Sequence, residues 1–162
     1  MIENITDRKF AQLFTSVGGL ILSWSMAERA VDECNLVFFQ DAGGSQIEPE
    51  LPRMLKRKIG FARRCLKNLP SLSTFEIIGI PLLDEMSRIS TLRHTVVHGT
   101  IINYDKDGTV FYFEMLDTLK MGHARKTHAV PRQTLLTVGQ ECLELADRLD
   151  AFAQSIVRAF MT

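Results

Sequence analysis

The first third of the chain repeats apolar side chains at helical spacing. No charged residue occurs between Phe10 and Ala27, and apolar residues return every three or four positions as far as Phe38. This period predicts one long helix that begins near Asp7 and ends near Phe39, before the sequence Gln-Asp-Ala-Gly-Gly-Ser. The uncharged stretch is long enough to span a membrane. Its serines, glycines, threonine and glutamine favour a face of a helical bundle instead, so we expect no membrane association.

Two more helices are predicted in the middle of the chain. One follows Pro52 and carries an apolar stripe opposite a basic face. The next has Ser73 and Glu76 as a capping box at its start, and Pro81 should kink it or mark its true beginning. Gly99 stands where a left-handed C-terminal cap would end this helix.

Beyond Thr100 the period changes to two. Alternating apolar residues flank Asp105–Gly108, which predicts a β-hairpin, and a third extended segment is expected over His123–Val130. Pro131 can open a last helix with apolar residues at alternating steps of three and four. The fold class predicted is mainly α: an up-and-down four-helix bundle with a β-hairpin or small antiparallel sheet, at about residues 100–130, before the last helix.

Composition limits the number of domains, the partners and the cellular location that we expect. With 162 residues and 46% apolar side chains, the chain fits one domain over residues 1–162. Nineteen basic and nineteen acidic residues cancel, so attraction to nucleic acid requires local clustering of charge. Cys34, Cys65 and Cys142 form no metal or redox pair and resemble buried thiols of a reducing compartment. The N-terminus lacks a signal-peptide pattern, so we expect a cytoplasmic location.

One short segment at the end of the third predicted helix carries the candidate chemistry. Arg93, His94 and His98 lie within six residues of one another. In RNA cleavage, His98 could take the proton of a ribose 2′-hydroxyl while Arg93 stabilises charge on the phosphate. This scheme needs no metal or cofactor. At 100° per residue, Arg93 and His98 lie about 140° apart around a helix, whereas His94 and His98 share a face.

The segment Leu-Arg-His-Thr-Val-Val-His-Gly, with four residues between Arg93 and His98, resembles the motif of the HEPN domain superfamily. The resemblance implies a HEPN-like bundle and a metal-independent endoribonuclease that leaves a 2′,3′-cyclic phosphate. It further implies a homodimer in which two copies of the motif build one cleft, with His94 in a supporting position. A role as a toxin or defence component, with an antitoxin or other protein as partner, follows from the same resemblance. Glu28 lies one turn from Trp24 on an otherwise apolar face, and it could orient Arg93 or a histidine of the third predicted helix. The alternative is that Glu28 forms a satisfied ion pair in the core or lies at a partly exposed edge.

The basic helix is the candidate RNA-binding surface, because its cations would meet a phosphate backbone. The alternative is a solvated face that pairs with acids of neighbouring helices such as Asp84 or Glu85. The candidate RNA-binding residues are Arg53, Lys56, Arg57, Arg63, Arg64 and Lys67.

Three alternatives stay open for the motif. Arg93 could form a structural salt bridge while His98 caps carbonyl groups at the helix end. His94 and His98 have the spacing of a zinc-binding helix, but no third ligand is evident unless His123 or His128 supplies one, so we expect no metal. The chain could also be a non-catalytic HEPN-like module that binds RNA or a protein.

Overall fold

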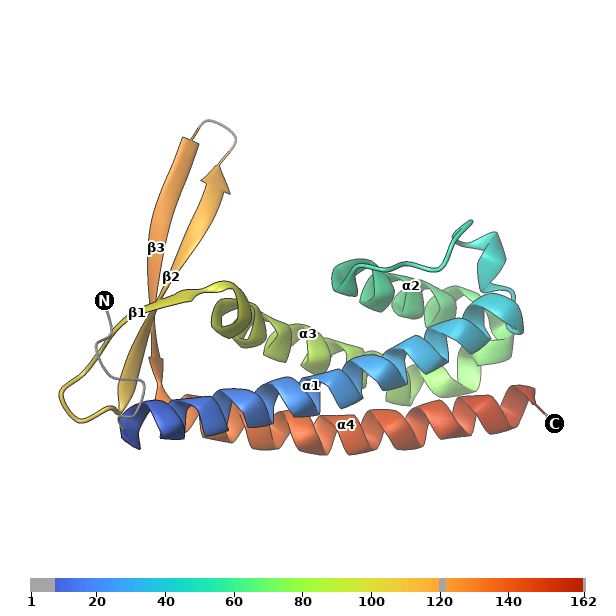
Figure 1. The fold of residues 1–162 in the computed structure, drawn as a ribbon. Helices are drawn as coiled ribbons and strands as arrows, with labels where there is room; N and C mark the ends of the chain where they lie inside the picture. The colour runs from blue at the N-terminus through green and yellow to red at the C-terminus, as the bar shows by residue number, and fades with distance from the viewer. Residues whose placement is uncertain (1–7, 120–121, 162) are drawn as a thin grey trace. The chain divides into compact units, whose positions relative to one another are not determined.

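The computed structural model of the chain describes residues 8–119 and 122–161. Within these residues the protein is mainly helical, with four long helices and a small three-stranded antiparallel sheet before the last helix (Figure 1). This much of the predicted fold class is confirmed. The long elements are α1 (Arg8–Gln40), α2 (Leu55–Asn68), α3 (Glu76–His98), β1 (Thr100–Tyr104), β2 (Val110–Leu119), β3 (Gly122–Pro131) and α4 (Arg132–Phe160).

The chain divides into two compact units, and α1, α3 and α4 each contribute residues to both. We call Ser23–Arg88 with Cys142–Thr162 the helical unit, and Met1–Leu22 with Ile89–Glu141 the sheet unit. The expectation that residues 1–162 form one domain stays a prediction.

The helical unit packs parts of all four helices around an apolar core. Trp24, Phe38 and Phe61 are its largest fully or almost fully buried side chains, each at most 2% exposed. The helices approach closely at Gly79 of α3, where an added Cβ would lie 2.7 Å from Leu66 Cδ1 and 2.8 Å from Phe152 Cζ. A larger residue at this position would overpack the core.

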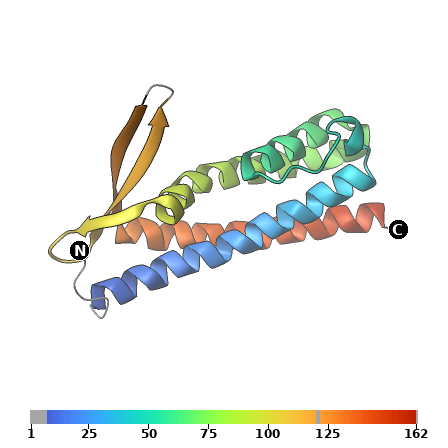
Figure 2. The same ribbon diagram turned by 45° about the horizontal axis from the view of Figure 1, so that its top comes forward.

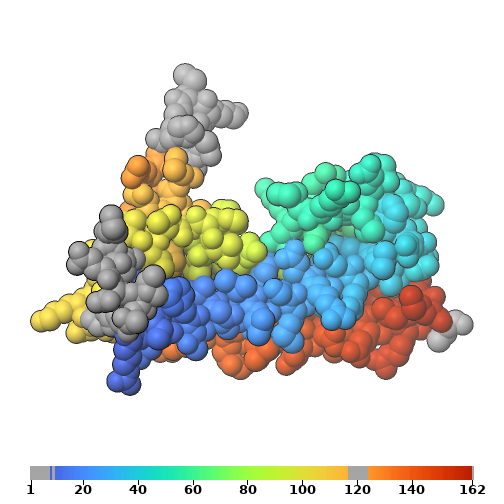
Figure 3. Space-filling view, viewed as in Figure 1, coloured from blue at the N-terminus to red at the C-terminus, as the bar shows by residue number. Residues whose placement is uncertain are grey.

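In the sheet unit, β2 is the central strand and pairs with β1 and β3. Phe111 and Phe113 of β2 are buried and lie opposite Val130 and His128 of β3. β1 pairs only with the first part of β2, as far as Glu114, so the outer part of β2 and β3 is a two-stranded ribbon. The ribbon stands clear of the rest of the sheet unit in Figures 1 and 3.

The predicted hairpin turn is confirmed. Gly108 has a φ of 68°, in the left-handed region that favours glycine. Asp105 closes the turn by accepting hydrogen bonds from the Thr109 hydroxyl, at 2.5 Å, and from the backbone N–H of Val110, at 2.9 Å. The bond from the Thr109 side chain is the main reason that the pKa of Asp105 lies below its usual value.

The ends of several elements differ from the predictions. Gly99 has no positive φ, so it is not a left-handed cap; its lack of a side chain allows close packing instead, as described below. The capping box is replaced by a 3-10 helix at Pro70–Phe75, in which Glu76 N–H donates to the carbonyl of Ser73. α3 begins at Glu76 and continues through Pro81. Pro131 ends β3 instead of opening α4, and the predicted cap Asp7 lies outside the described residues.

α1 is one continuous helix through Gly18 (Figure 2). Its portion Phe10–Gln40 is long and apolar enough to cross a membrane, with a mean hydropathy of 1.3 in its most apolar window, and 39% of that window is buried in the structure. A core helix meets the same criterion. Leu13, Leu20 and Ala27 are fully buried along this helix.

Candidate histidine pair and basic helix

His94 and His98 form an exposed pair on the last turn of α3. Their ring centroids lie 4.7 Å apart with the ring planes at 52°, and both side chains are exposed. The spacing of four residues places both rings on one side of the helix, as predicted from the sequence. An imidazole can donate or accept a proton near neutral pH, so two adjacent rings could serve as acid and base toward one ligand.

Arg93 occupies a different side of α3. It is half-buried and its Nε is buried, and the side chain interacts with other groups in the structure. Helical geometry puts it on the side of Ile89 and Val96, which are both buried. Because α3 stays helical through His98, Arg93 and His98 of one chain do not share a face.

Gly99 joins this helix end to the sheet. An added Cβ would lie 2.5 Å from the carbonyl oxygen of Thr95 and 3.0 Å from Cβ of Phe113. Phe113 pairs across strands with His128, which is half-buried. The backbone beside His98 is therefore held directly against the central strand. The side chain of His123 lies outside the described residues.

The basic helix α2 is largely neutralised by acids. Arg57 and Arg64 both pair with Glu48, Arg57 at 3.3 Å, and the Glu48 side chain is only 18% exposed. Arg63 donates to Asp84 of α3 at 2.5 Å. Pairing with acids of neighbouring helices was the alternative weighed for these residues. It holds for Arg63, whereas Arg57 and Arg64 pair with an acid of the irregular segment before α2.

Three of the candidate RNA-binding cations stay available. Arg53, Lys56 and Lys67 are exposed, and none of them forms an ion pair with another described residue. With Arg57 and Arg64, the two lysines lie within about 100° of arc around α2. They form the basic stripe, which we define as Lys56, Arg57, Arg64 and Lys67.

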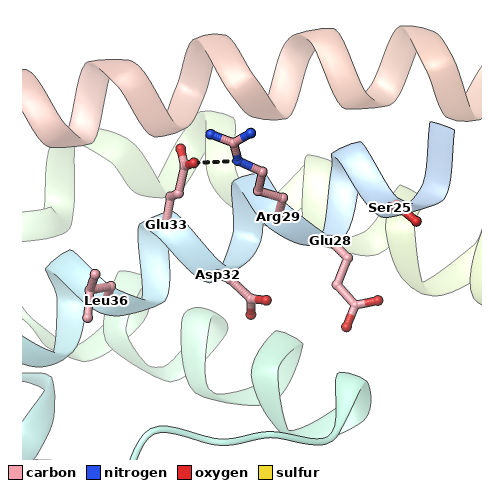
Figure 4. A pocket seen from close by; sticks show the side chains of 6 residues that line it. All are labelled: Ser25, Glu28, Arg29, Asp32, Glu33 and Leu36. Carbon is pink, nitrogen blue, oxygen red and sulfur yellow. Dashed lines mark hydrogen bonds and ion pairs between the residues drawn. The ribbon is translucent and has the colours of Figure 1, made fainter. Parts of the chain in front are cut away.

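Glu28 has partners other than the motif. Its Oε2 accepts a hydrogen bond from Trp24 Nε1 at 3.1 Å, and its Oε1 accepts from Lys58 Nζ at 3.0 Å. Lys58 also donates to Asp32 at 2.8 Å. Figure 4 shows Glu28 and Asp32 extending to the same side of α1. A satisfied ion pair was the alternative weighed for Glu28, and its role toward Arg93 stays a prediction.

Lys58 was not singled out in the sequence, although it is the least exposed cation of α2 among those with described ion pairs. Burial acts to lower its pKa, but the hydrogen bonds and charges of Asp32 and Glu28 outweigh burial, so its pKa lies above the usual value. Its position outside the basic stripe was the available signal. Its acidic partners, Glu28 and Asp32, lie on α1, far from Lys58 in the sequence. The pattern of residues around Lys58 therefore did not indicate them.

The structure adds two observations on metal and thiol chemistry. Among the residues that the structure describes, no three His, Cys, Asp or Glu side chains are grouped to hold a metal ion. Cys34, Cys65 and Cys142 are buried and unpaired with one another, as expected. Burial raises the pKa of Cys34 and of Cys65 to about 12 and that of Cys142 to about 11, so these thiols are poor nucleophiles at neutral pH.

Comparison with known proteins gives no relative: no family model, no curated protein and no solved structure matches this chain.

Proposed function

We propose that the chain is a metal-independent endoribonuclease of HEPN type, located in the cytoplasm, in which His94 and His98 supply the acid–base chemistry. The observation that carries the proposal is the exposed histidine pair at the end of α3. One imidazole would take the proton from a ribose 2′-hydroxyl, and the other would protonate the leaving 5′-oxygen. The 2′-oxygen forms a bond to phosphorus as the P–O5′ bond breaks, which yields a 2′,3′-cyclic phosphate and a 5′-hydroxyl.

Arg93 would stabilise the charge that develops on the phosphate. Since Arg93 and His98 lie on different sides of α3, we propose that the enzyme is a homodimer in which each chain brings one of these groups to a shared cleft. A HEPN-like bundle and a partner such as an antitoxin belong to the same proposal. Their support is the resemblance of the segment from Arg93 to His98.

Cleavage of end-labelled RNA of mixed sequence, in EDTA, tests the proposal. We expect cyclic-phosphate ends from the wild type and a loss of about 10²- to 10⁴-fold in rate for His98→Ala. Thr91→Ala, an exposed substitution on the same helix, is the matched control and should cleave like the wild type. A substrate with 2′-deoxyribose should resist cleavage. Failure of the wild type to cleave any RNA, or equal cleavage by His98→Ala, would remove the catalytic role.

The second candidate is a non-catalytic module that binds RNA. The observation that favours it is the basic stripe on α2, whose two lysines have no acidic partner among the described residues. Binding through Lys56, Lys67 and Arg53 would weaken with salt, with a slope of log Kd against log salt near 0.7 per phosphate contacted on single strands. RNA affinity that falls with Lys56→Gln and Lys67→Gln, without cleavage by the wild type, would support this function over the first.

A further inference from the structure

A groove lies in the helical unit between α1 and the segment before α2. One wall is a face of α1 with Asp32, Asn35, Leu36 and Phe39, and the other is Pro49–Arg53, which we call the strap. Lys58 of α2 also lines the groove, whose volume is about 760 Å³. This volume is in the range of ligand sites in proteins. We call it the α1–strap groove.

Asn35 supplies an unused acceptor at this groove. Its side chain is 2% exposed, and its Nδ2 donates to the backbone carbonyl of Lys58 at 3.2 Å. That bond assigns the orientation of the amide and leaves Oδ1 as an acceptor. Oδ1 is buried and accepts no hydrogen bond from the part of the chain that the structure describes. A buried polar atom of this kind costs about 1 to 3 kcal/mol unless a donor reaches it.

The strap has free peptide groups. Two prolines, Pro49 and Pro52, bias the residues before them toward extended backbone. Over residues 8–119 and 122–161, no backbone–backbone hydrogen bond outside helices and strands involves Pro49–Arg53. The chain bends at Pro49 and Glu50. Beyond the bend, the N–H groups of Leu51 and Arg53, which are two residues apart, can pair with an extended chain laid beside them.

The groove also has apolar surface. Leu36 is 43% exposed, and Phe39 and Leu51 are half-buried around it. These side chains would cover one apolar side chain of a ligand. A partner with both peptide groups and an apolar side chain matches this combination of surfaces.

The charges of the groove favour a protein partner over a nucleic acid. Asp32 and Glu50 balance Arg53 and Lys58 among its lining residues, so the groove does not attract a polyanion. Lys58 is committed to Asp32 and Glu28. Arg53 is exposed and has no ion pair with another described residue, so it is the cation available to a ligand.

We propose that the α1–strap groove binds an extended peptide segment of a partner protein. A backbone N–H of the peptide donates to Asn35 Oδ1, an apolar side chain packs on Leu36, and an acidic side chain pairs with Arg53. This binding is separate from the proposed RNA cleavage and does not depend on it.

Selection from a displayed library of random dodecapeptides on the immobilised full chain tests the proposal. We expect peptides that combine an apolar residue with a nearby acid. Fluorescence anisotropy with synthetic copies should show binding about tenfold weaker to Leu36→Asp. N-methylation of one peptide amide should weaken binding by a similar factor, since Oδ1 of Asn35 then loses its donor.

Arg53→Glu supplies a charge-reversal test. The variant should bind the acidic peptides less well and regain affinity for copies in which lysine replaces the acid. The matched control is Leu22→Asp, which puts the same charge at a 70% exposed position of α1 outside the groove; it should bind like the wild type.

Three results would overturn the proposal. The first is selection that enriches no peptide, and the second is equal binding by Leu36→Asp and Leu22→Asp. The third is that no peptide binds, while an adenylate RNA oligomer binds the wild type and does not bind Leu36→Asp. That result would assign the groove to nucleic acid.

Discussion

Gly99 should not tolerate a side chain, because it occupies the contact between the end of α3 and the central strand. In Gly99→Ala the new Cβ would lie 2.5 Å from the carbonyl oxygen of Thr95 and 3.0 Å from Cβ of Phe113. Neither atom is the end of a flexible side chain, so relief requires movement of backbone. Overpacking of this kind costs about 1 to 3 kcal/mol, and we expect the upper half of that range. For a chain of this size that lowers Tm by roughly 4 to 12 °C.

Thermal unfolding followed by circular dichroism, with urea unfolding for the free energy, measures this effect. Gly18→Ala is the matched control, since Gly18 is an exposed helical glycine with no atom within 4 Å of an added Cβ. It should gain about 0.5 to 1 kcal/mol from helix propensity. A Gly99→Ala protein as stable as the wild type, or one that changes like Gly18→Ala, would refute the packing argument.

Two further predictions concern ionisable groups of the helical unit. Lys58→Met should lower the free energy of unfolding by about 1 to 2 kcal/mol at neutral pH, since Glu28 and Asp32 lose their shared donor while solvent still reaches them. The folded-state pKa of Lys58 is raised above 10.5, so its contribution to stability is complete below pH 10.5 and is lost as pH rises through the raised value. Urea unfolding from pH 9 to 12 should show a constant gap between wild type and variant below pH 10.5 that narrows above it, and a gap that stays constant up to pH 12 would contradict this. The buried thiols, of which Cys34 has a pKa of about 12, should react with a disulfide reagent at pH 8 only as fast as the protein opens, and rapid labelling of the native protein would contradict that.

Hydrophobic spacing was sufficient for the helices and strands but not for their ends. The period of three and four predicted α1 from near Asp7 to near Phe39 and a helix after Pro52, because each helix must bury one apolar face; the structure has α1 to Gln40 and α2 from Leu55. The junction at Gly99 was predicted wrongly: glycine serves both left-handed caps and close contacts. Pairing in the sheet places Phe113 beside Gly99. Only this position shows that the glycine serves a close contact and not a left-handed cap.

Part of the candidate site could also be predicted from the spacing of residues in the sequence. The pairing of His94 with His98 depends on local spacing alone, and the ring contact agrees with it. Asp84 was among the acids weighed as partners of the α2 cations, and it pairs with Arg63. Glu48, the partner of Arg57 and Arg64, was not, since it lies in the irregular segment before α2. Asn35 gave no signal at all, because an unused acceptor is visible only once its surroundings are known.

The two-stranded ribbon of β2 and β3 has a consequence for how the protein behaves at high concentration. Beyond Glu114 neither of its edges pairs with a further strand of residues 8–119 and 122–161, and open edges can recruit strands from other molecules. Lys126 is exposed in this part of β3, and the neighbouring Arg125 is exposed with an ion pair to Glu114. Because Glu114 balances Arg125, Lys126 is the exposed cation in this part of the ribbon without an ion pair to another described residue. A lysine beside an open strand edge disfavours pairing with a second copy of the same ribbon, so Lys126 acts against aggregation through this edge.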